Sequence, residues 1–222
     1  MPAEDQPSWS GFHKAALGRP PRELLVRTLN FFVVEGRPPG VAVDLGCGSG
    51  PDTLELLRRG WQVHAVDAEA SGLAMLRDVA PPEAQARLFT HAARFESFEF
   101  PPCDLVWAGF ALPFCPASEF AALLQRAASA LNVGGRIAGD IFGDRHAWSV
   151  ESDVTTLSEQ QARSALDYLT IEAFDIEDGY RVSGGEVTKW HAFGFAARKA
   201  ILAQPEYLAG TMVACDTGAR TL

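Results

Sequence analysis

The sequence predicts an α/β fold, a three-layer sandwich in which helices cover both faces of one mostly parallel, seven-stranded sheet. Short apolar runs alternate with segments of helical apolar spacing over residues 22–142, which is typical of parallel strands joined by helical crossovers. Two strand-like runs, 169–176 and 189–198, then follow each other with no room for a helix over 177–187. Strands joined in this way pair antiparallel, so we expect a C-terminal hairpin at one edge of the sheet.

The first half of the chain shows the alternation most clearly. Apolar residues three and four positions apart predict a helix over 22–35, and Pro38, Pro39 and Gly40 end it. A glycine at position 60 is typical of a helix C-terminus. In chain order we expect a helix over 22–35, a strand over 41–45, a helix over 53–59, a strand over 63–67, a helix over 70–79 and a strand over 86–90.

The second half continues the pattern with longer elements. Phe120, Leu123, Leu124, Ala127 and Leu131 share one face of a predicted helix. Ser158, with Glu and Gln in the following turn, is a typical helix start. In order we expect a strand over 104–107, a helix over 118–131, a strand over 134–142, a helix from 158, and the two hairpin strands.

Length and periodicity together indicate one domain over residues 1–222. A chain of 222 residues with 47% hydrophobic content is long enough to bury a full core. The periodic core runs over 22–198, after a polar segment over 1–21 that Pro and Gly interrupt. Residues 199–222 lack periodicity, so we expect a loose tail there.

Composition excludes several kinds of partner. The chain has 19 basic and 28 acidic residues, a formal net charge of −9, and no run of Lys or Arg. We therefore expect no nucleic-acid partner. The four cysteines show no C-x-x-C spacing, which argues against a metal site and for a reducing compartment. Because no apolar stretch is long enough to span a bilayer and the N-terminus lacks a signal pattern, we expect a cytoplasmic protein without membrane attachment.

The segment 41–50, VAVDLGCGSG, is the most informative in the chain. An apolar strand ends in an acid, and glycines then alternate with small residues before a helix. Such a turn lets a ligand approach the backbone closely, because glycine has no Cβ. The dinucleotide pattern G-x-G-x-x-G would need a glycine at position 51, which is Pro51. The spacing therefore argues against a dinucleotide site.

This loop resembles the S-adenosylmethionine loop of class I methyltransferases, which have a Rossmann-like fold. The resemblance covers residues 22–198, including the order of the strands and the terminal hairpin. It implies that Asp44 positions the methionine amino group, that Gly46 and Gly48 form the close turn, and that Asp67 accepts the ribose hydroxyls. Taken singly, each of these residues fits better as a turn glycine or a strand-end cap, and only together do they favour a cofactor site. The cofactor-binding residues expected from the resemblance are Asp44, Gly46, Cys47, Gly48, Gly50, Asp67, Ala68, Arg94, Phe95 and Ala108.

One position departs from the family pattern. The turn after the third strand usually carries an acid near the adenine amino group, whereas this chain has Arg94 there. Phe95 or the local backbone is the alternative adenine contact.

The segment 109–116 is where the family brings its acceptor to the methyl group. It contains no [DNS]-P-P-[YF] motif and no Pro-Cys pair, so it does not match the amino-methylating or cytosine-C5 nucleic-acid enzymes. Phe110 and Phe114 make it apolar and aromatic, which suits a small organic or soft-atom acceptor. Cys115 fits a buried structural thiol better than a nucleophile.

The segment 143–148 supplies polar groups at the end of a strand. It resembles the F-G-D-R-x-x-W segment of methyltransferases similar to the tellurite-resistance enzyme. His146 is a candidate general base or a loop residue that caps the strand. Arg145 is a candidate for substrate carboxylate recognition or for a salt bridge to Asp144 or Glu151. Trp148 completes the segment as a candidate substrate contact.

The N-terminal segment 1–21 is a lid over the site in comparable enzymes. Its aromatic residues, Trp9 and Phe12, fit either a lid or the packing of the next helix, and we expect Phe12 to contact substrate. His13 is a weaker candidate base. His64 and His191 are expected to be ordinary strand residues.

The resemblance implies methyl transfer from S-adenosylmethionine to a small-molecule acceptor. One alternative is a protein that binds S-adenosylmethionine or S-adenosylhomocysteine without transfer. Others are a protein or nucleic-acid methyltransferase, and an aminopropyl transferase or S-adenosylmethionine-modifying enzyme, which would need further acids near Asp44. The acceptor atom and the oligomeric state are not specified by the sequence.

Overall fold

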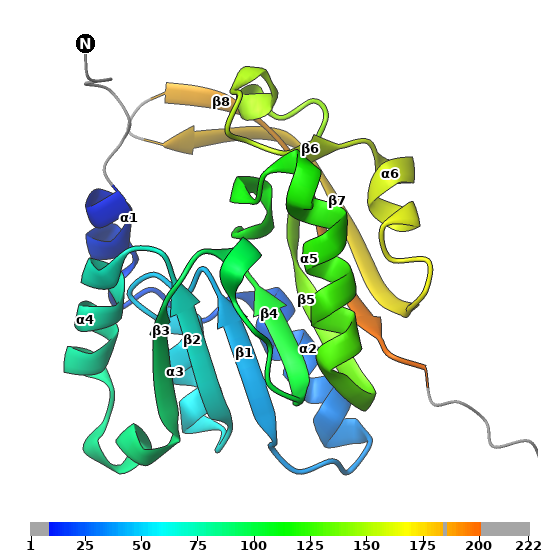
Figure 1. Cartoon of the computed structure of the whole chain (residues 1–222). Helices are drawn as coiled ribbons and strands as arrows, with labels where there is room; N and C mark the ends of the chain where they lie inside the picture. Colours follow the sequence, from blue (N-terminus) through cyan, green and yellow to red (C-terminus); the bar gives the residue numbers. More distant parts are fainter. Residues whose placement is uncertain (1–8, 184–185, 201–222) are drawn as a thin grey trace, which may run out of the picture.

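A computed structural model describes residues 9–183 and 186–200 of the chain. It contains a sheet in the order β3-β2-β1-β4-β5-β8-β7, with the short β6 pairing to β5 (Figure 1). All pairings are parallel except β5–β8 and β7–β8. The strands are β1 (Val41–Leu45), β2 (Gln62–Asp67), β3 (Leu88–Ala92), β4 (Cys103–Ala108), β5 (Leu131–Gly143), β6 (Thr156–Leu157), β7 (Thr170–Ser183) and β8 (Glu186–Arg198).

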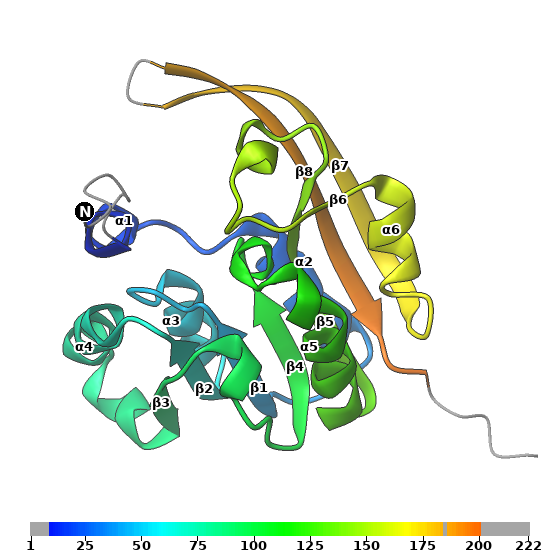
Figure 2. The ribbon, with the colours of Figure 1, turned by 45° about the horizontal axis from the view of Figure 1, so that its top comes forward.

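Helices cover both faces of this sheet. One layer holds α2, α3 and α4, the other holds α5 and α6, and α1 lies beyond the carboxyl ends of the strands (Figures 1 and 2). The α-helices are α1 (Trp9–Ala16), α2 (Glu23–Val34), α3 (Pro51–Arg58), α4 (Ala70–Val79), α5 (Ala117–Ala130) and α6 (Glu159–Ser164). Single-turn helices are η1 (Pro82–Arg87), η2 (Phe95–Ser97), η3 (Leu112–Phe114) and η4 (Ala147–Val150).

The predicted three-layer fold is confirmed, and the sheet gains the two-residue β6 as an eighth strand. Helix α6 begins after Ser158, which forms a capping box with Gln161, so its predicted start is also confirmed. Helix α4 occupies the predicted residues 70–79.

Some local bounds differ from the prediction. Helix α1 spans residues 9–16, within the segment 1–21 for which the sequence predicted no element by its bounds. Strand β3 begins at Leu88 rather than 86, because η1 occupies the preceding residues. The hairpin strands also continue through most of 177–187, which the sequence predicted only as the connection between them. Cross-strand pairs there, Lys189 with Asp178 among them, make a polar ladder compatible with strand structure.

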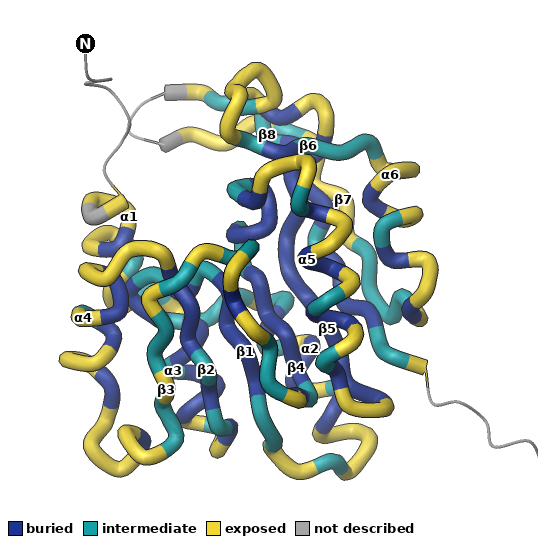
Figure 3. The backbone as a smooth tube through the Cα atoms, viewed as in Figure 1, coloured by how far each residue is buried: buried dark blue, intermediate teal, exposed yellow. Residues whose placement is uncertain are grey.

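The core lies between the central strands and the helices on each face. Strands β1, β4 and β5 are dark blue along most of their length in Figure 3, whereas the far end of the β7–β8 hairpin is exposed. Beside the core, Arg136 is buried and pairs with Glu35 and Glu172, which ties α2 to the hairpin.

Parts of the predicted domain organisation lie outside the described residues. These are residues 1–8 of the N-terminal segment and residues 201–222 of the expected tail. Within the described ranges, no helix is both long and apolar enough to cross a membrane.

Candidate active site

The glycine loop lies between the end of β1 and the start of α3, at the carboxyl edge of the sheet. Gly46 and Gly48 have φ values of 66° and 54°, which side chains rarely adopt. A Cβ on Gly46 would also lie 2.6 Å from Cβ of Ala111, and the Phe95 ring is close to the same point. The amides of residues 46 and 47 both donate to the Val66 carbonyl, which fixes the loop to β2. The loop is therefore a rigid turn with room only for backbone.

Asp67 ends β2 directly beside this loop. One carboxylate oxygen accepts the Gly48 amide at 2.8 Å, and the other accepts the Glu69 amide at 2.8 Å. Each oxygen keeps a further lone pair, since a carboxylate has about four acceptor positions. Asp67 thus braces the loop and can still accept hydroxyl groups from a ligand.

Asp44 lies beneath the loop and is 2% exposed. Thr53 donates a hydrogen bond of 2.5 Å to its carboxyl group. Burial, and then the nearby charge of Asp52, raises the pKa of Asp44 to about 8. Among the described residues it forms no ion pair, so a cationic group placed nearby would stabilise its ionised form.

Asp52 holds the N-terminal segment onto the site. Its carboxylate accepts hydrogen bonds from the Arg19 guanidinium, the Arg22 amide and the Trp107 indole. The Arg22 guanidinium lies 3.5 Å from the same group. This acid was not among the expected site residues, although its place in the first turn after the glycine loop was a usable signal.

Helix α1 rests on the glycine loop. The Ser49 hydroxyl donates to the His13 carbonyl at 2.8 Å, and the His13 ring packs so closely that a Cβ on Gly48 or Gly72 would touch it. His13 is 7% exposed, and its Nδ1 has no hydrogen-bond partner among the described residues. The expected lid segment therefore lies over the loop, with His13 turned inward.

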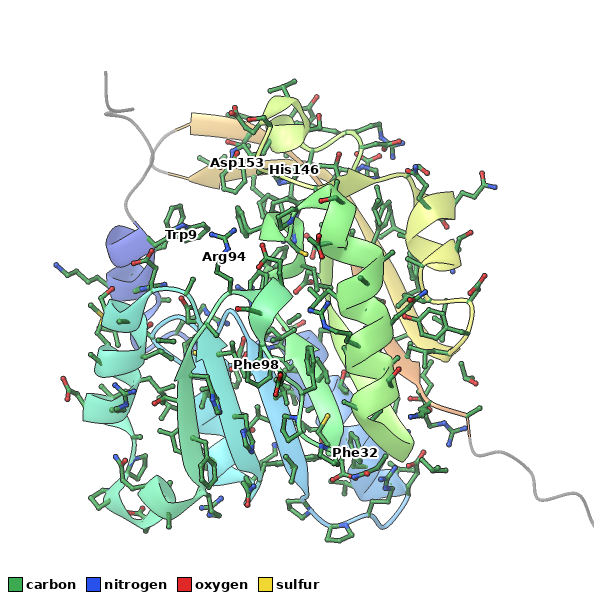
Figure 4. All side chains as sticks on the ribbon, in the orientation of Figure 1. Trp9, Phe32, Arg94, Phe98, His146 and Asp153 are labelled. Atoms are coloured by element: carbon green, nitrogen blue, oxygen red, sulfur yellow. The ribbon has the colours of Figure 1, made fainter. Side chains whose placement is uncertain are left out.

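The remaining expected cofactor residues differ in what they offer. The Cys47 side chain packs in a core cluster with Ala65, so Cys47 can offer a ligand at the loop only its backbone. Ala68 is exposed after β2, and Ala108 is fully buried at the end of β4. Arg94 pairs with Glu96 at 3.2 Å and points from the end of β3 toward the level of Trp9 (Figure 4).

Six rings form a group at the carboxyl ends of β4 and β5, which we name the acceptor-side cluster. Neighbouring ring centres lie 3.9–6.4 Å apart. The Trp9 ring on α1 lies 4.8 Å from the Phe114 ring, and Phe12 in turn contacts Trp9. The members of the cluster are Phe110, Phe114, Phe142, His146, Trp148 and Trp190.

Phe110 is held in an unusual backbone conformation. Its φ of 52° is the one positive value at a non-glycine position in the described part of the chain. The Arg22 guanidinium lies 4.5 Å from the ring centre, and the Phe110 amide donates to Asp140 at 3.2 Å. The ring is thereby fixed between a cation and the cluster.

Asp140 is a second acid that the sequence analysis did not single out. It is buried in β5, and burial raises its pKa to about 7, despite the opposing effect of Arg22. A carboxyl group with this pKa can take up or release a proton near neutral pH. An acid near the end of a central parallel strand was the available signal.

His146 is 1% exposed and stacks on Phe142 with ring centres 3.9 Å apart (labelled in Figure 4). Its Nδ1 accepts the Trp148 amide at 3.0 Å, so the neutral ring carries its proton on Nε2. Burial, followed by the effect of His191, lowers its pKa to about 4. The arrangement favours a hydrogen-bond donor over the general base that the sequence suggested.

Arg145 is engaged in a salt bridge, one of its two expected roles, but the partner was not foreseen. Its guanidinium contacts Asp178 on β7 at 2.6 Å and His191 at 3.0 Å. Neither Asp144 nor Glu151, the partners expected from the sequence, pairs with it. His64 and His191 lie in β2 and β8, as expected of strand residues.

Among the described residues, no three or more His, Cys, Asp or Glu side chains lie together in a group that could hold a metal ion. Burial raises the pKa of the Cys115 thiol to about 11, which keeps it protonated near neutral pH.

Comparisons with known proteins agree with this geometry. A family model described as a methyltransferase domain matches residues 42–135, from β1 to β5. A segment of 111 residues is 32% identical to the carboxy-S-adenosyl-L-methionine synthase of Psychrobacter sp. (strain PRwf-1). That match covers 46% of this chain and 40% of the synthase, so the chain spans well under half of that relative.

Solved structures share the fold at low identity. TehB from Haemophilus influenzae aligns with a TM-score of 0.66 and 17% identity, over 78% of this chain and 62% of TehB. The 1,6-didemethyltoxoflavin-N1-methyltransferase of Burkholderia thailandensis, solved with its substrate and S-adenosylhomocysteine, aligns with a TM-score of 0.63 and 20% identity, over 86% of this chain and 84% of that enzyme. The fold is that of class I methyltransferases, and a domain of this type implies S-adenosylmethionine as cofactor.

Proposed function

We propose that this chain, whose residues 42–135 match a family model described as a methyltransferase domain, transfers a methyl group from S-adenosylmethionine to a small-molecule acceptor. The observation that carries the proposal is the buried Asp44. Among residues 9–183 and 186–200 this acid has no ion-pair partner, and it lies under a glycine loop that excludes side chains.

The residues fit the cofactor at three points. An ammonium group beside Asp44 would lower the pKa of that acid and supply the missing positive partner. Asp67 has acceptor capacity left for two ribose hydroxyls. Arg19 and Arg22, held by Asp52, provide positive charge for a carboxylate at the same end. When bound, S-adenosylmethionine supplies an electrophilic methyl group on a positively charged sulfur.

The chain's own contribution is orientation and exclusion of water. Helix α1 covers the glycine loop through Ser49 and His13, and Trp9 extends that cover to Phe114. Phe110 lies beside Arg22 at the end of β4, in the segment expected to face the acceptor. Asp140, with a pKa of about 7, is placed to accept a proton from an acceptor group at the Phe110 turn.

Chemistry that modifies S-adenosylmethionine itself is a second candidate. The partial match to the carboxy-S-adenosyl-L-methionine synthase favours it, and so does Asp52, which supplies the further acid beside Asp44. However, Asp52 is already engaged by Arg19 and Arg22. We therefore favour methyl transfer.

One experiment distinguishes methyl transfer, modification of S-adenosylmethionine itself, and cofactor binding without any reaction. S-adenosylmethionine with a labelled methyl group is incubated with the protein and a panel of phenols, thiols, amines, carboxylates and soft oxyanions, and products are read by mass spectrometry. We expect S-adenosylhomocysteine and one labelled acceptor in equal amounts. A modified S-adenosylmethionine would support the second candidate. Tight S-adenosylhomocysteine binding without any turnover would favour a binding protein, and no binding would refute both proposals.

A further inference from the structure

We propose that the acceptor-side cluster binds a planar aromatic or heteroaromatic molecule through its ring faces and through an oxygen atom that accepts two hydrogen bonds. This inference deepens the proposed function, on which it rests, by naming a class of acceptor. It depends on the exposure of the rings and on two hydrogen-bond donors that have no partner in the described part of the chain.

The cluster is only partly buried, unlike a core. Phe142 and His146 are 2% and 1% exposed and form its base. Phe110, Phe114, Trp148 and Trp190 remain partly exposed around that base. Trp9 and Phe12, which extend it on α1, are 41% and 47% exposed. Partly exposed rings that gather beside a glycine loop are typical of a ligand site rather than of a folding core.

Two donors in the cluster have no acceptor. Nε1 of Trp190 and Nε2 of His146 are buried and unpartnered among the described residues, and their ring centres lie 4.8 Å apart. Because Nδ1 of His146 accepts the Trp148 amide, its Nε2 carries the proton. A buried donor without a partner costs about 1–3 kcal/mol. One hydroxyl or carbonyl oxygen has two lone pairs and could satisfy both donors.

The two sets of observations select one chemical class. A hydrocarbon would leave both donors unpaired, and an aliphatic alcohol would pair them but could not stack on the rings. A small oxyanion would offer no apolar surface to the rings. An aromatic molecule can also stack at the ring spacings found here. The structure thus favours an oxygen-bearing aromatic ring over the soft oxyanions that the sequence left open.

Direct binding tests the proposal without relying on turnover. The probes are 1-naphthol, 4-hydroxyquinoline and 7-hydroxyflavone, with naphthalene lacking the oxygen and cyclohexanol lacking the aromatic ring. Each is titrated against the full chain, with and without S-adenosylhomocysteine, by equilibrium dialysis. We expect at least one oxygen-bearing probe to bind with a Kd below about 1 mM and cyclohexanol not to bind.

Two variants remove one donor each and keep an aromatic ring. Trp190→Phe and His146→Phe should each weaken binding of the oxygen-bearing probe by about 5–20-fold and change naphthalene binding by less than about twofold. Trp61→Phe makes the same change to an indole that packs against Phe32, outside the cluster, and should bind the probe as the original chain does.

Two results would overturn the proposal. One is that no oxygen-bearing aromatic probe binds under either condition. The other is that both donor variants bind the probe as tightly as the original chain. If S-adenosylhomocysteine does not bind the original chain, that result counts against the proposed function. The probe titrations without S-adenosylhomocysteine still test the acceptor-side cluster by itself. Trp190→Phe keeps the test valid if His146→Phe, which also removes the acceptor for the Trp148 amide, fails to fold.

Discussion

The two halves of the site are built from different materials. The half at β1 and β2 is made of backbone: two loop amides bond to β2, and Asp67 accepts two more. The half at β4 and β5 is made of rings contributed by β4–η3, β5, η4 and β8. A site built from backbone suits a ligand that is the same in many proteins of one fold. A site built from side chains can be altered by substitution without a change of fold. This contrast fits a fixed cofactor and a variable acceptor.

The largest effect should come from the backbone half. Asp67→Ala leaves two amides without acceptors and removes the proposed ribose contact, so S-adenosylhomocysteine affinity should fall by about 150-fold, or about 3 kcal/mol. Calorimetric titration measures this change. Glu69→Ala, an exposed acid two residues later, is the matched control. Unchanged affinity in Asp67→Ala would remove Asp67 from the site.

In the half of the site that holds the rings, Asp140 should make the folding stability depend on pH. Asp140 has a folded pKa of about 7, above the ordinary value for an aspartate, so the folded state binds its proton more tightly. That stabilisation is lost as pH rises toward 7, and above it the buried charge is destabilising. Asp140→Asn should therefore gain stability relative to the original chain between pH 5 and pH 8, by about 2.5 kcal/mol.

Urea unfolding at both pH values measures the Asp140 effect. Asp178→Asn is the control, because its partners Lys189 and Arg145 lower the pKa of Asp178 to about 2. Its contribution is lost only as pH falls below the ordinary aspartate range, so it should add no pH dependence between 5 and 8. An equal stability difference at pH 5 and pH 8 for Asp140→Asn would contradict the shifted pKa.

The smallest effect should come from the lid. Ser49→Ala removes one hydrogen bond between the loop and α1, and we expect about a fivefold loss of S-adenosylhomocysteine affinity. Ser129→Ala removes a comparable hydroxyl-to-carbonyl bond on α5, far from the loop, and should have no effect. Equal affinities for the two variants would separate α1 from cofactor binding.

The backbone half of the site could be predicted from the sequence better than the half made of rings. The loop and Asp67 follow strands whose apolar patterns are local, so residues 41–67 could be placed from short motifs. The alternation of strands and helices along the chain, and the terminal hairpin, followed from the same periodicity. The aromatic segments 109–116 and 143–148 were recognised in the sequence. Their contact with Trp190, however, depends on the pairing of β8 with β5, which no local pattern specifies.

Roles that depend on distant partners were predicted least well. Arg145 pairs with Asp178, 33 positions later, only because the hairpin extends past the sheet. The hydrogen bonding and burial of His146 set its protonation state, and neither could be seen in the chain. Helix α1 is eight residues long and is held by contacts with the loop rather than by its own propensity.

The backbone conformation of Phe110 determines what a substitution by glycine would do at this position. A left-handed conformation at a residue with a side chain costs about 1–2 kcal/mol, and glycine would adopt it without that cost. Glycine would also leave no ring between Arg22 and Trp190. Backbone strain and ring contacts therefore act in opposite directions at this position: glycine would relieve the strain and remove the contacts with Arg22 and Trp190.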